Sequence, residues 1–501
     1  MIFFLHLAYY STKLFAKSMI VYTFTVKIFN MKIIGRKKEQ TDFKTFFELQ
    51  QPEFVAVYGR RRVGKTFLIK EYFNQKFAFY VTGLANADKR EQLDNFNVSL
   101  GHYARVPYPQ ASSWLDAFRQ LIHLLENYSK EKKKVVFIDE MPWLDTAKSG
   151  FLTGLEFFWN SWASSRPDIL LIVCGSASSW ITNKLLRNKG GLHNRVTRRM
   201  QISPFTLKES EDYFAEKKME YTKRDIVEAY MTFGGIPFYL NMFEKGKSVA
   251  QNIDLLCFDE NAPLKNEFDM LFSSLFKRPQ NHIQVVNFLA KKKKGQTRED
   301  IANHIGNKGG GLTIVLEELE QCGFIKSYYA YKKKTKDKLF QLTDSFVLFY
   351  YSFMKENNNT DSNYWFNMLG SAKYRNWSGH SFESVCLLHI KQIKTALGIA
   401  AVSTNITNWR SKNVETGAEI DLLIDRRDNI INICEIKYSE KEFTIDKSYA
   451  DNLRNKKATF AEDTKARKAL HLTMITTYGV KHNEYWGNIQ SEVTMDDLFE
   501  K

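Results

Sequence analysis

The strongest constraint on the fold is one short segment near the start of the chain. Residues 59–66 read Gly-Arg-Arg-Arg-Val-Gly-Lys-Thr and fit the pattern G-x-x-x-x-G-K-[ST]. The apolar run Phe54–Tyr58 comes before it, and apolar residues at helical spacing follow it. In a strand, loop and helix of this kind, loop N–H groups and the helix N-terminus converge on phosphate oxygens. The pattern therefore predicts a nucleotide phosphate site; a plain basic turn is the alternative.

The residues of this loop have distinct expected roles. Lys65 is expected to reach the β- and γ-phosphates and to act in catalysis, while the Thr66 hydroxyl is expected to bind Mg²⁺. The other expected nucleotide-binding residues of the segment are Gly59, Arg60, Arg61, Arg62, Val63, Gly64 and Phe67.

An acidic strand end supports this prediction. Val135–Ile138 is a continuous apolar run that ends in Asp139 and Glu140, as expected of a parallel strand buried on both faces. Two carboxylates in that position need a cationic partner. Asp139 is therefore expected to bind Mg²⁺ through water, and Glu140 to polarise an attacking water. An acidic turn without a ligand is the alternative.

Two further segments are candidates for the same site. A third apolar strand begins at Ile169 and ends near Ser176, whose hydroxyl could sense the γ-phosphate or orient water. Downstream, Arg195, Arg198 and Arg199 could supply an arginine finger or a sensor, with Arg195 as the candidate. A small residue at a strand end and a solvated basic turn explain these segments equally well.

Composition and charge bound the class of protein. A chain of 501 residues, 44% of them hydrophobic, predicts about two to four domains with apolar cores. Five cysteines without a C-x-x-C pair indicate a reducing compartment rather than disulfides or a zinc site, so we expect a cytoplasmic protein. The formal charge of +16 favours a polyanionic partner, although lysine-rich surfaces also arise without one.

The N-terminal segment, residues 1–30, is apolar but is interrupted by Lys13, Lys17 and Lys27. No apolar run in it reaches the roughly 20 residues that span a bilayer, and it lacks the basic start and cleavage site of a signal peptide. Because a domain start is recognisable at Met31, we expect a start codon assigned too early. A peripheral membrane anchor is the alternative, and no transmembrane segment is expected.

The middle of the chain divides by its periodicity. Strands alternate with helical stretches over residues 31–215, which predicts a parallel sheet with helices on both faces. Thr206 and Glu209 have capping-box spacing, so a helix is expected to start there. Residues 216–278 read as helical, broken by a Gly-Gly-Ile-Pro turn at 234–237.

Residues 279–354 predict three helices and a two-stranded hairpin, the arrangement of a winged helix. The third helix carries Glu317, Glu318 and Glu320, which would repel phosphates, so a packing module is favoured over a DNA-reading one. The hairpin-tip lysines could touch a nucleic-acid backbone without reading its sequence. They are Lys332, Lys333, Lys334, Lys336 and Lys338.

A polar linker precedes the last domain, residues 362–501, which places ionisable residues among apolar ones. Glu383 lies in a helical pattern, Asp421 in an apolar strand, and Glu435 and Lys437 on one face of the next strand. A divalent cation held by Asp421 and Glu435, with Glu383 completing its outer coordination, would match these charges. Lys437 could then stabilise a hydroxide that attacks a phosphodiester. A salt-bridged β-hairpin is the alternative.

These motifs resemble the archaeal-type ATPase family, a STAND-branch group of P-loop ATPases related to AAA+ proteins. GRRRVGKT and VVFIDEMPWL resemble its Walker A and Walker B motifs, which implies ATP as the nucleotide. IIGRKKE resembles its N-terminal segment, which places Ile34, Gly35 and Arg36 on the adenine side. GGIP is similar to its lid element, which places Pro237 against the nucleotide.

The C-terminal part resembles the restriction-endonuclease-like domain attached to many members of that family. Its motif maps onto Glu383, Asp421, Glu435 and Lys437, with Ile420-Asp421 in place of the usual Pro-Asp. The expected fold class is α/β, with a P-loop NTPase parallel sheet, a helical lid, a winged helix and a C-terminal α/β restriction-endonuclease-like domain.

The expected function is an ATP- and Mg²⁺-dependent ATPase that acts as a switch for a nuclease-like domain working on DNA or RNA. In the alternative, the C-terminal domain is catalytically inactive and binds a partner. A protein partner or a second copy of the chain is also compatible with the sequence.

Overall fold

The structure is a computed structural model. It describes residues 32–176, 178–186, 190–292, 294–306, 309–332, 338–357, 363–411 and 417–500. The predicted extension over residues 1–30 therefore lies outside the described residues, as do three of the hairpin-tip lysines. The chain divides into two compact units: the first contains the residues up to Val55 and Gly64–Cys174, and the second contains Ala56–Val63 and Gly175–Lys501.

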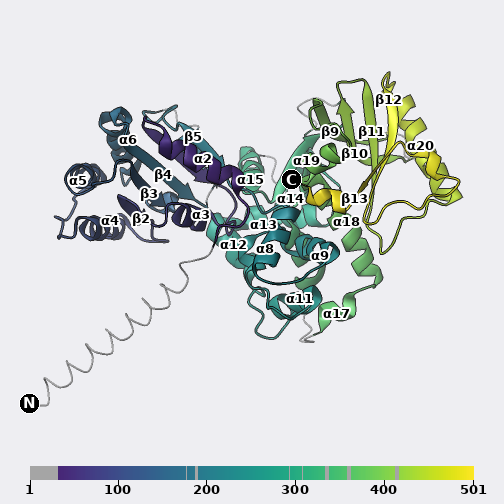
Figure 1. The fold of residues 1–501 in the computed structure, drawn as a ribbon, viewed down its shortest axis with the longest axis horizontal. Helices are drawn as coiled ribbons and strands as arrows, with labels where there is room; N and C mark the ends of the chain where they lie inside the picture. Colours follow the sequence, from purple (N-terminus) through teal and green to yellow (C-terminus); the bar gives the residue numbers. More distant parts are fainter. Residues whose placement is uncertain are drawn as a thin grey trace, which may run out of the picture. The chain divides into compact units, whose positions relative to one another are not determined.

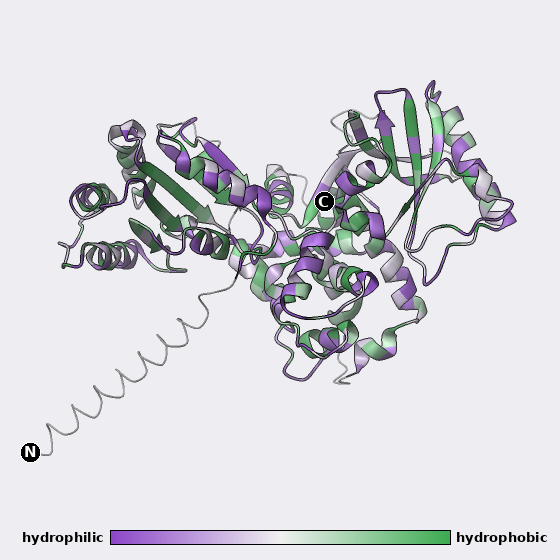
Figure 2. Cartoon of the chain, in the orientation of Figure 1, coloured by the Kyte–Doolittle hydropathy of each residue, from purple (hydrophilic) through white to green (hydrophobic). Residues whose placement is uncertain are grey.

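A five-stranded sheet forms the N-terminal part of the fold (Figure 1), in the order β2-β3-β4-β1-β5. Strand β2 pairs parallel with β3, and β3 pairs parallel with β4. Every residue of β3 and β4 is buried, and Figure 2 shows this apolar centre in green. The predicted α/β class is thus confirmed. The strands are β1 (Glu53–Tyr58), β2 (Phe79–Thr82), β3 (Lys134–Asp139), β4 (Ile169–Gly175) and β5 (Arg198–Gln201).

Helices cover the sheet through aromatic-rich faces. Trp114 and Phe118 of α5 are buried and pack on Phe151 of α6, with ring centroids 4.9 and 5.9 Å apart. Each of these large rings buries a wide apolar surface against the sheet layer. The helices of the first unit are α2 (Lys37–Glu48), α3 (Lys65–Tyr72), α4 (Lys89–Ala104), α5 (Trp114–Asn127) and α6 (Phe151–Ser161).

A buried lysine ties together loops at one end of the sheet. The Lys133 ammonium donates to the carbonyl oxygens of Leu49, Gln51 and Pro167, each at 2.8 Å. Three such bonds satisfy every donor of the ammonium group, so this side chain can be buried without a large penalty.

The second unit continues with helices that follow β5. Thr206 accepts from the Glu209 N–H at 3.2 Å, and the Glu209 side chain accepts from the Thr206 N–H at 3.0 Å, so the predicted capping box is confirmed. Gly235 has φ of 64°, and a Cβ there would overlap the Phe205 carbonyl, which explains the glycine. These helices are α8 (Leu207–Glu216), α9 (Lys223–Phe233), α10 (Pro237–Leu240), α11 (Val249–Cys257) and α12 (Glu267–Leu275).

Up to its last strand, the described part of the segment predicted as a winged helix contains three helices and a three-stranded sheet in the order β6-β8-β7. The short strand β6 was not predicted, because two residues carry no periodicity. Beyond this sheet, Asp344 begins a further helix, α16 (Ser345–Phe349). The elements are α13 (Pro279–Ala290), β6 (Gln296–Thr297), α14 (Arg298–Ile305), α15 (Gly310–Gln321), β7 (Ile325–Tyr329) and β8 (Lys338–Leu342).

The C-terminal part is built on a mixed sheet of order β13-β12-β11-β10-β9. Strand β10 runs antiparallel to β9 and β11, whereas β11, β12 and β13 are parallel. Its elements are α17 (Tyr364–Met368), α18 (Ala372–Leu388), α19 (Ile390–Ala396), β9 (Thr404–Arg410), β10 (Glu419–Arg426), β11 (Ile430–Lys437), α20 (Lys447–Thr464), β12 (Ala469–Thr476) and β13 (Ser491–Thr494).

The chain leaving β7 joins the outer strand of this sheet. Ala330 forms a parallel bridge with Asn408 of β9, and the Tyr331 N–H donates to the Asn408 carbonyl at 2.9 Å. The Tyr331 ring also packs on Phe460 of α20, with centroids 5.2 Å apart. The β7–β8 hairpin is thereby attached to the C-terminal sheet.

No helix among the described residues combines the length and the apolar character needed to cross a membrane.

Candidate nucleotide site and C-terminal carboxylate cluster

The loop between β1 and α3 depends on glycine at both ends. Gly59 has φ of 146°, and a Cβ there would overlap the Ile202 carbonyl oxygen, whereas Gly64 has φ of 86° with open space around it. Arg62 also has a left-handed backbone, with φ of 71°. Single left-handed residues within a loop, as at Arg62 and Gly64, can turn neighbouring N–H groups to one side, which is how backbone concavities bind anions.

The start of α3 and the acidic strand end, far apart in sequence, meet within the first unit. The Thr66 hydroxyl donates to the two carboxylate oxygens of Asp139, at 3.1 and 2.9 Å. Lys65, the residue before Thr66, is buried at the start of α3. Lys65, expected to bind the phosphates, is therefore next in sequence to Thr66, which contacts Asp139, the other residue expected to bind Mg²⁺.

The acidic strand end carries a concentrated negative charge. Burial raises the pKa of Asp139, and the neighbouring Glu140 carboxylate raises it further, while the Thr66 hydrogen bond opposes both. Glu140 has a left-handed backbone with φ of 43°, and its N–H donates to Asp139 at 3.0 Å. A divalent cation would relieve the repulsion between these carboxylates, so the residues fit Mg²⁺.

Thr66 and Asp139 are the groups that would hold that ion. Mg²⁺ commonly takes only one or two carboxylates from the protein, and phosphate oxygens and water supply the rest. Within the described ranges, no three or more His, Cys, Asp or Glu side chains form a group that could hold a metal ion. That is compatible with a site completed by the nucleotide.

The remaining predicted residues fall in both units. Ile34, Gly35 and Arg36 precede α2 in the first unit; Arg36 is buried, and the Gly35 carbonyl accepts from the Gln40 side chain at 2.8 Å. The second unit contains Ser176, which is buried at the end of β4, and Arg195, which is exposed.

Four more residues were predicted to bind the nucleotide. Val63 is buried, Arg61 and Phe67 are half-buried, and Pro237 is the first residue of α10.

Two loop arginines have protein partners that the sequence did not predict. Arg60 forms an ion pair with Asp344, at the start of α16, and Arg62 forms one with Glu267 of α12. Both carboxylates are almost completely buried. These guanidinium groups, predicted to bind nucleotide, therefore point to carboxylates within the second unit.

In the C-terminal sheet, Glu435 is surrounded by donors. Its Oε1 accepts from the Tyr449 hydroxyl at 2.8 Å and lies 3.0 Å from the Lys437 ammonium, and its Oε2 accepts from Lys456 at 2.7 Å. Burial opposes ionisation of Glu435, but Lys456 and Lys437 outweigh it and lower its pKa. Lys437 and Glu435 share one strand face, as their spacing predicted.

Asp421 is the other carboxylate of this cluster. Burial raises its pKa, and the charges of Glu383 and Glu435 raise it further. Its strand β10 contains a register shift between Ile420 and Leu423. In the part of the chain that the structure describes, no group of three or more His, Cys, Asp or Glu side chains is placed to hold a metal ion. Lysine and tyrosine donors surround Glu435, and the predicted set of Glu383, Asp421 and Glu435 stays a prediction.

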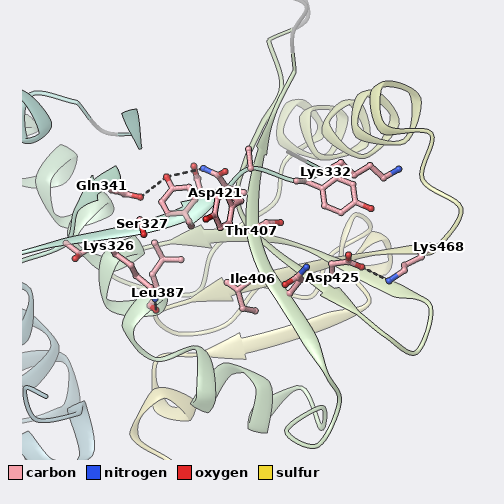
Figure 3. A pocket seen from close by; sticks show the side chains of 17 residues that line it. Lys326, Ser327, Lys332, Gln341, Leu387, Ile406, Thr407, Asp421, Asp425 and Lys468 are labelled. Carbon is pink, nitrogen blue, oxygen red and sulfur yellow. Dashed lines mark hydrogen bonds and ion pairs between the residues drawn. The ribbon is translucent and has the colours of Figure 1, made fainter. Parts of the chain in front are cut away.

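A cavity of about 940 Å³ lies beside Asp421 (Figure 3). The β7 strand contributes Lys326 and Tyr328 to its wall, and β9 contributes Asn408. The Tyr328 hydroxyl donates to Gln341 at 3.0 Å and accepts from the Asn408 amide at 3.2 Å. The cavity thus has polar walls from the hairpin and from the C-terminal sheet.

Sequence reasoning missed Tyr449 and Lys456, which hold Glu435 from α20. They follow Asp446, which caps α20 by accepting from the Tyr449 N–H at 2.7 Å. Tyr449 lies in the first turn of α20 and Lys456 seven residues later, about two turns further on. This spacing puts both side chains on one face of the helix. That spacing was the available signal.

The sheet, the glycine loop and the acidic strand end together define a P-loop ATPase. The sequence matches a family model described as an ATPase domain predominantly from Archaea over residues 34–243. This part of the chain is therefore an archaeal-type ATPase domain, as its motifs predicted.

A curated relative matches most of the chain. It is Uncharacterized protein MJECL04 of Methanocaldococcus jannaschii, 25% identical over 437 residues, which cover 86% of this chain and 93% of the relative.

Solved structures of low sequence identity are also similar. The Walker-type ATPase PABY2304 of Pyrococcus abyssi is 17% identical, with a TM-score of 0.47 over 63% of this chain and 95% of that one. The ORC2 protein of Aeropyrum pernix, in ADPNP–ADP complexes, is 14% identical, with a TM-score of 0.38 over 64% of this chain and 95% of that one.

Proposed function

We propose that this chain is a Mg²⁺-dependent ATPase that works as a nucleotide switch. The observation that carries the proposal is the contact between Thr66 and Asp139, at 2.9 and 3.1 Å. It joins the phosphate loop to the acidic strand end that would share its metal ion. Lys65 would hold the β- and γ-phosphates, and Glu140 would polarise the attacking water.

Other residues have proposed roles around the same nucleotide. Ile34, Gly35 and Arg36 would contact the adenine side, and Pro237 would lie against the nucleotide. Ser176 would sense the γ-phosphate, and Arg195 would stabilise charge in the transition state. When bound, Mg²⁺ would neutralise phosphate charge, while the protein groups position the phosphates and the water.

Nucleotide binding and its metal requirement test this proposal directly. ATP at 100 times its Kd should stabilise the full chain by about 2.7 kcal/mol, measured as a rise in the unfolding midpoint. Phosphate release should require Mg²⁺ and stop when EDTA is added, because Thr66 and Asp139 then lack their shared ion. AMP, which lacks the β- and γ-phosphates, is the matched control. A chain whose midpoint ATP leaves unchanged would contradict the proposal.

The output of the switch is proposed to be the C-terminal domain, acting on nucleic acid. Supporting this, Glu435 and Lys437 share a strand face, and the Asp421 carboxylate lines a polar cavity. In the alternative, the domain binds a partner without catalysis, and the saturation of Glu435 by Tyr449, Lys437 and Lys456 is compatible with this.

Cleavage assays separate these two outputs. The full chain is incubated with plasmid DNA or single-stranded RNA and Mg²⁺ or Mn²⁺, with and without ATP. A nuclease should lose cleavage by about 10²-fold or more in Asp421→Ala and Lys437→Ala, because each removes a charged group from the reacting site. Asp212→Asn, which removes a Lys208 ion pair of 2.9 Å on α8, is the control. Equal cleavage in all four proteins, or none in any, favours the binding module.

A further inference from the structure

Arg60 of the phosphate loop is held by a buried carboxylate from far along the chain. Its guanidinium forms an ion pair with Asp344, and the side chains are 5% and 1% exposed. The guanidinium carbon also lies 5.4 Å from the centre of the Phe324 ring. Arg60, Asp344 and Phe324 all belong to the second compact unit.

Arg62 is held in the same way by a different element. It forms an ion pair with Glu267 of α12, which is 2% exposed, and its guanidinium lies 4.1 Å from the centre of the Phe238 ring. The other Glu267 oxygen accepts from the Tyr239 hydroxyl at 2.6 Å. Both loop arginines are thus bound to elements that follow the ATPase sheet.

The carboxylates are fixed by bonds of their own. Asp344 caps α16 by accepting from the Val347 N–H at 2.9 Å, and its own N–H donates to the Phe324 carbonyl at 3.2 Å. Tyr239, which holds Glu267, packs on Phe346 with ring centroids 5.2 Å apart. Because these acceptors are already placed, the ion pairs position the arginines rather than the reverse.

Arg60 and Arg62 stand on either side of Arg61 in the loop, between Gly59 and Gly64. Arg62 has the left-handed backbone, with φ of 71°, that bulky residues seldom adopt without support. Buried charged pairs have narrow geometry and are costly to separate, so the loop backbone is fixed at both arginines.

We propose that Asp344 and Glu267 are positioning residues for the phosphate loop, acting through Arg60 and Arg62. They hold the loop backbone in the conformation that receives the triphosphate, and they make ATP affinity depend on the elements around α12 and α16. This inference rests on the proposed function, since it assigns the ion pairs to nucleotide binding rather than to stability alone.

The test separates loop positioning from stability by removing one charge and then both. Asp344→Asn keeps the helix cap but leaves Arg60 buried opposite a neutral group. It should weaken binding of a fluorescent ATP analogue to the full chain by about tenfold or more, which corresponds to the free energy of a charge-assisted hydrogen bond. It should also lower the unfolding midpoint.

Arg60→Met combined with Asp344→Asn should bring the unfolding midpoint back toward that of the wild type, because no unpaired charge remains. ATP binding should stay weak, because the loop has lost its anchor. If this double variant regains both stability and affinity, or if Asp344→Asn lowers the midpoint at unchanged affinity, the pair is structural only and the inference fails.

A matched control and a nucleotide-free measurement complete the test. Asp168→Asn removes ion pairs with Lys134 and Arg166 at 2.7 and 3.0 Å, so it should lower the midpoint without changing ATP affinity.

Hydrogen exchange of the loop peptide without nucleotide should be faster in Asp344→Asn and in the double variant, but not in Asp168→Asn. If the wild type does not bind ATP, the proposed function fails, and the exchange rates still decide whether Asp344 positions the loop.

Discussion

Lys65→Ala is expected to weaken ATP binding by about 10²–10⁴-fold, because Lys65 would make two charge-assisted contacts with phosphate, each worth about 1.5–3 kcal/mol. The side chain is 6% exposed and influences the Cys174 thiol at the end of β4. The Asp139 carboxylate influences the same thiol, so Lys65 lies near the end of β3 that carries the acidic pair. Titration calorimetry with ATP and Mg²⁺ measures the effect.

The matched control for this substitution is Lys76→Ala. Lys76 is an exposed lysine in the turn that follows α3, so its removal changes the net charge equally but leaves the loop intact. ATP affinity equal to that of the wild type in Lys65→Ala would remove the basis for a triphosphate site in this loop.

Glu140→Gln is expected to leave ATP binding nearly unchanged and to lower the hydrolysis rate by about 10²–10⁴-fold, the usual contribution of a positioned general base. The amide keeps the size and hydrogen-bonding reach of the side chain but cannot polarise water as a carboxylate does. Removing this charge also relieves its effect on Asp139, whose pKa Glu140 raises. Steady-state phosphate release and equilibrium binding, measured on the same preparation, separate the two effects.

Glu131→Gln is a suitable comparison, because Glu131 is an exposed carboxylate in the turn before β3. Hydrolysis that survives in Glu140→Gln at the wild-type rate would assign the base to another residue. Loss of binding as well as hydrolysis would instead give Glu140 a role in holding the nucleotide or its ion.

Local patterns predicted the parts of the site that local chemistry determines. The glycines at 59 and 64, the lysine and threonine that follow, and the acidic pair after an apolar run all stand at fixed spacings. The contact between Thr66 and Asp139 then joins two of these local motifs. The strand face shared by Glu435 and Lys437 followed from the twofold period of a strand.

Partners distant in sequence could not be predicted in this way. Arg60, Arg61 and Arg62 look equivalent in the sequence, yet two of them are bound by carboxylates at 344 and 267. Lys133 likewise stands among neighbouring lysines, but it alone is bonded to three carbonyl groups of other loops. Tertiary packing decides which of several neighbouring arginines or lysines forms such contacts, and the periodicity of the sequence does not contain that information.

The C-terminal cluster shows the same limit. The metal set was inferred from the order of its carboxylates, while Lys456 and Tyr449 on α20 supply the donors that occupy Glu435. The register shift in β10 also interrupts the alternation that would assign Asp421 to one face. The order of charged residues along the strands therefore could not show which lysines pair with the strand carboxylates.

The bridge between Ala330 and Asn408 has a consequence for association. Outer strands with unpaired amides are templates for strand addition by foreign peptides or by other copies of a chain. At Asn408 the carbonyl is already taken by Tyr331, so an incoming strand would first have to peel the hairpin away. At this position of its outer strand, the chain thus occupies a template site with a segment of its own.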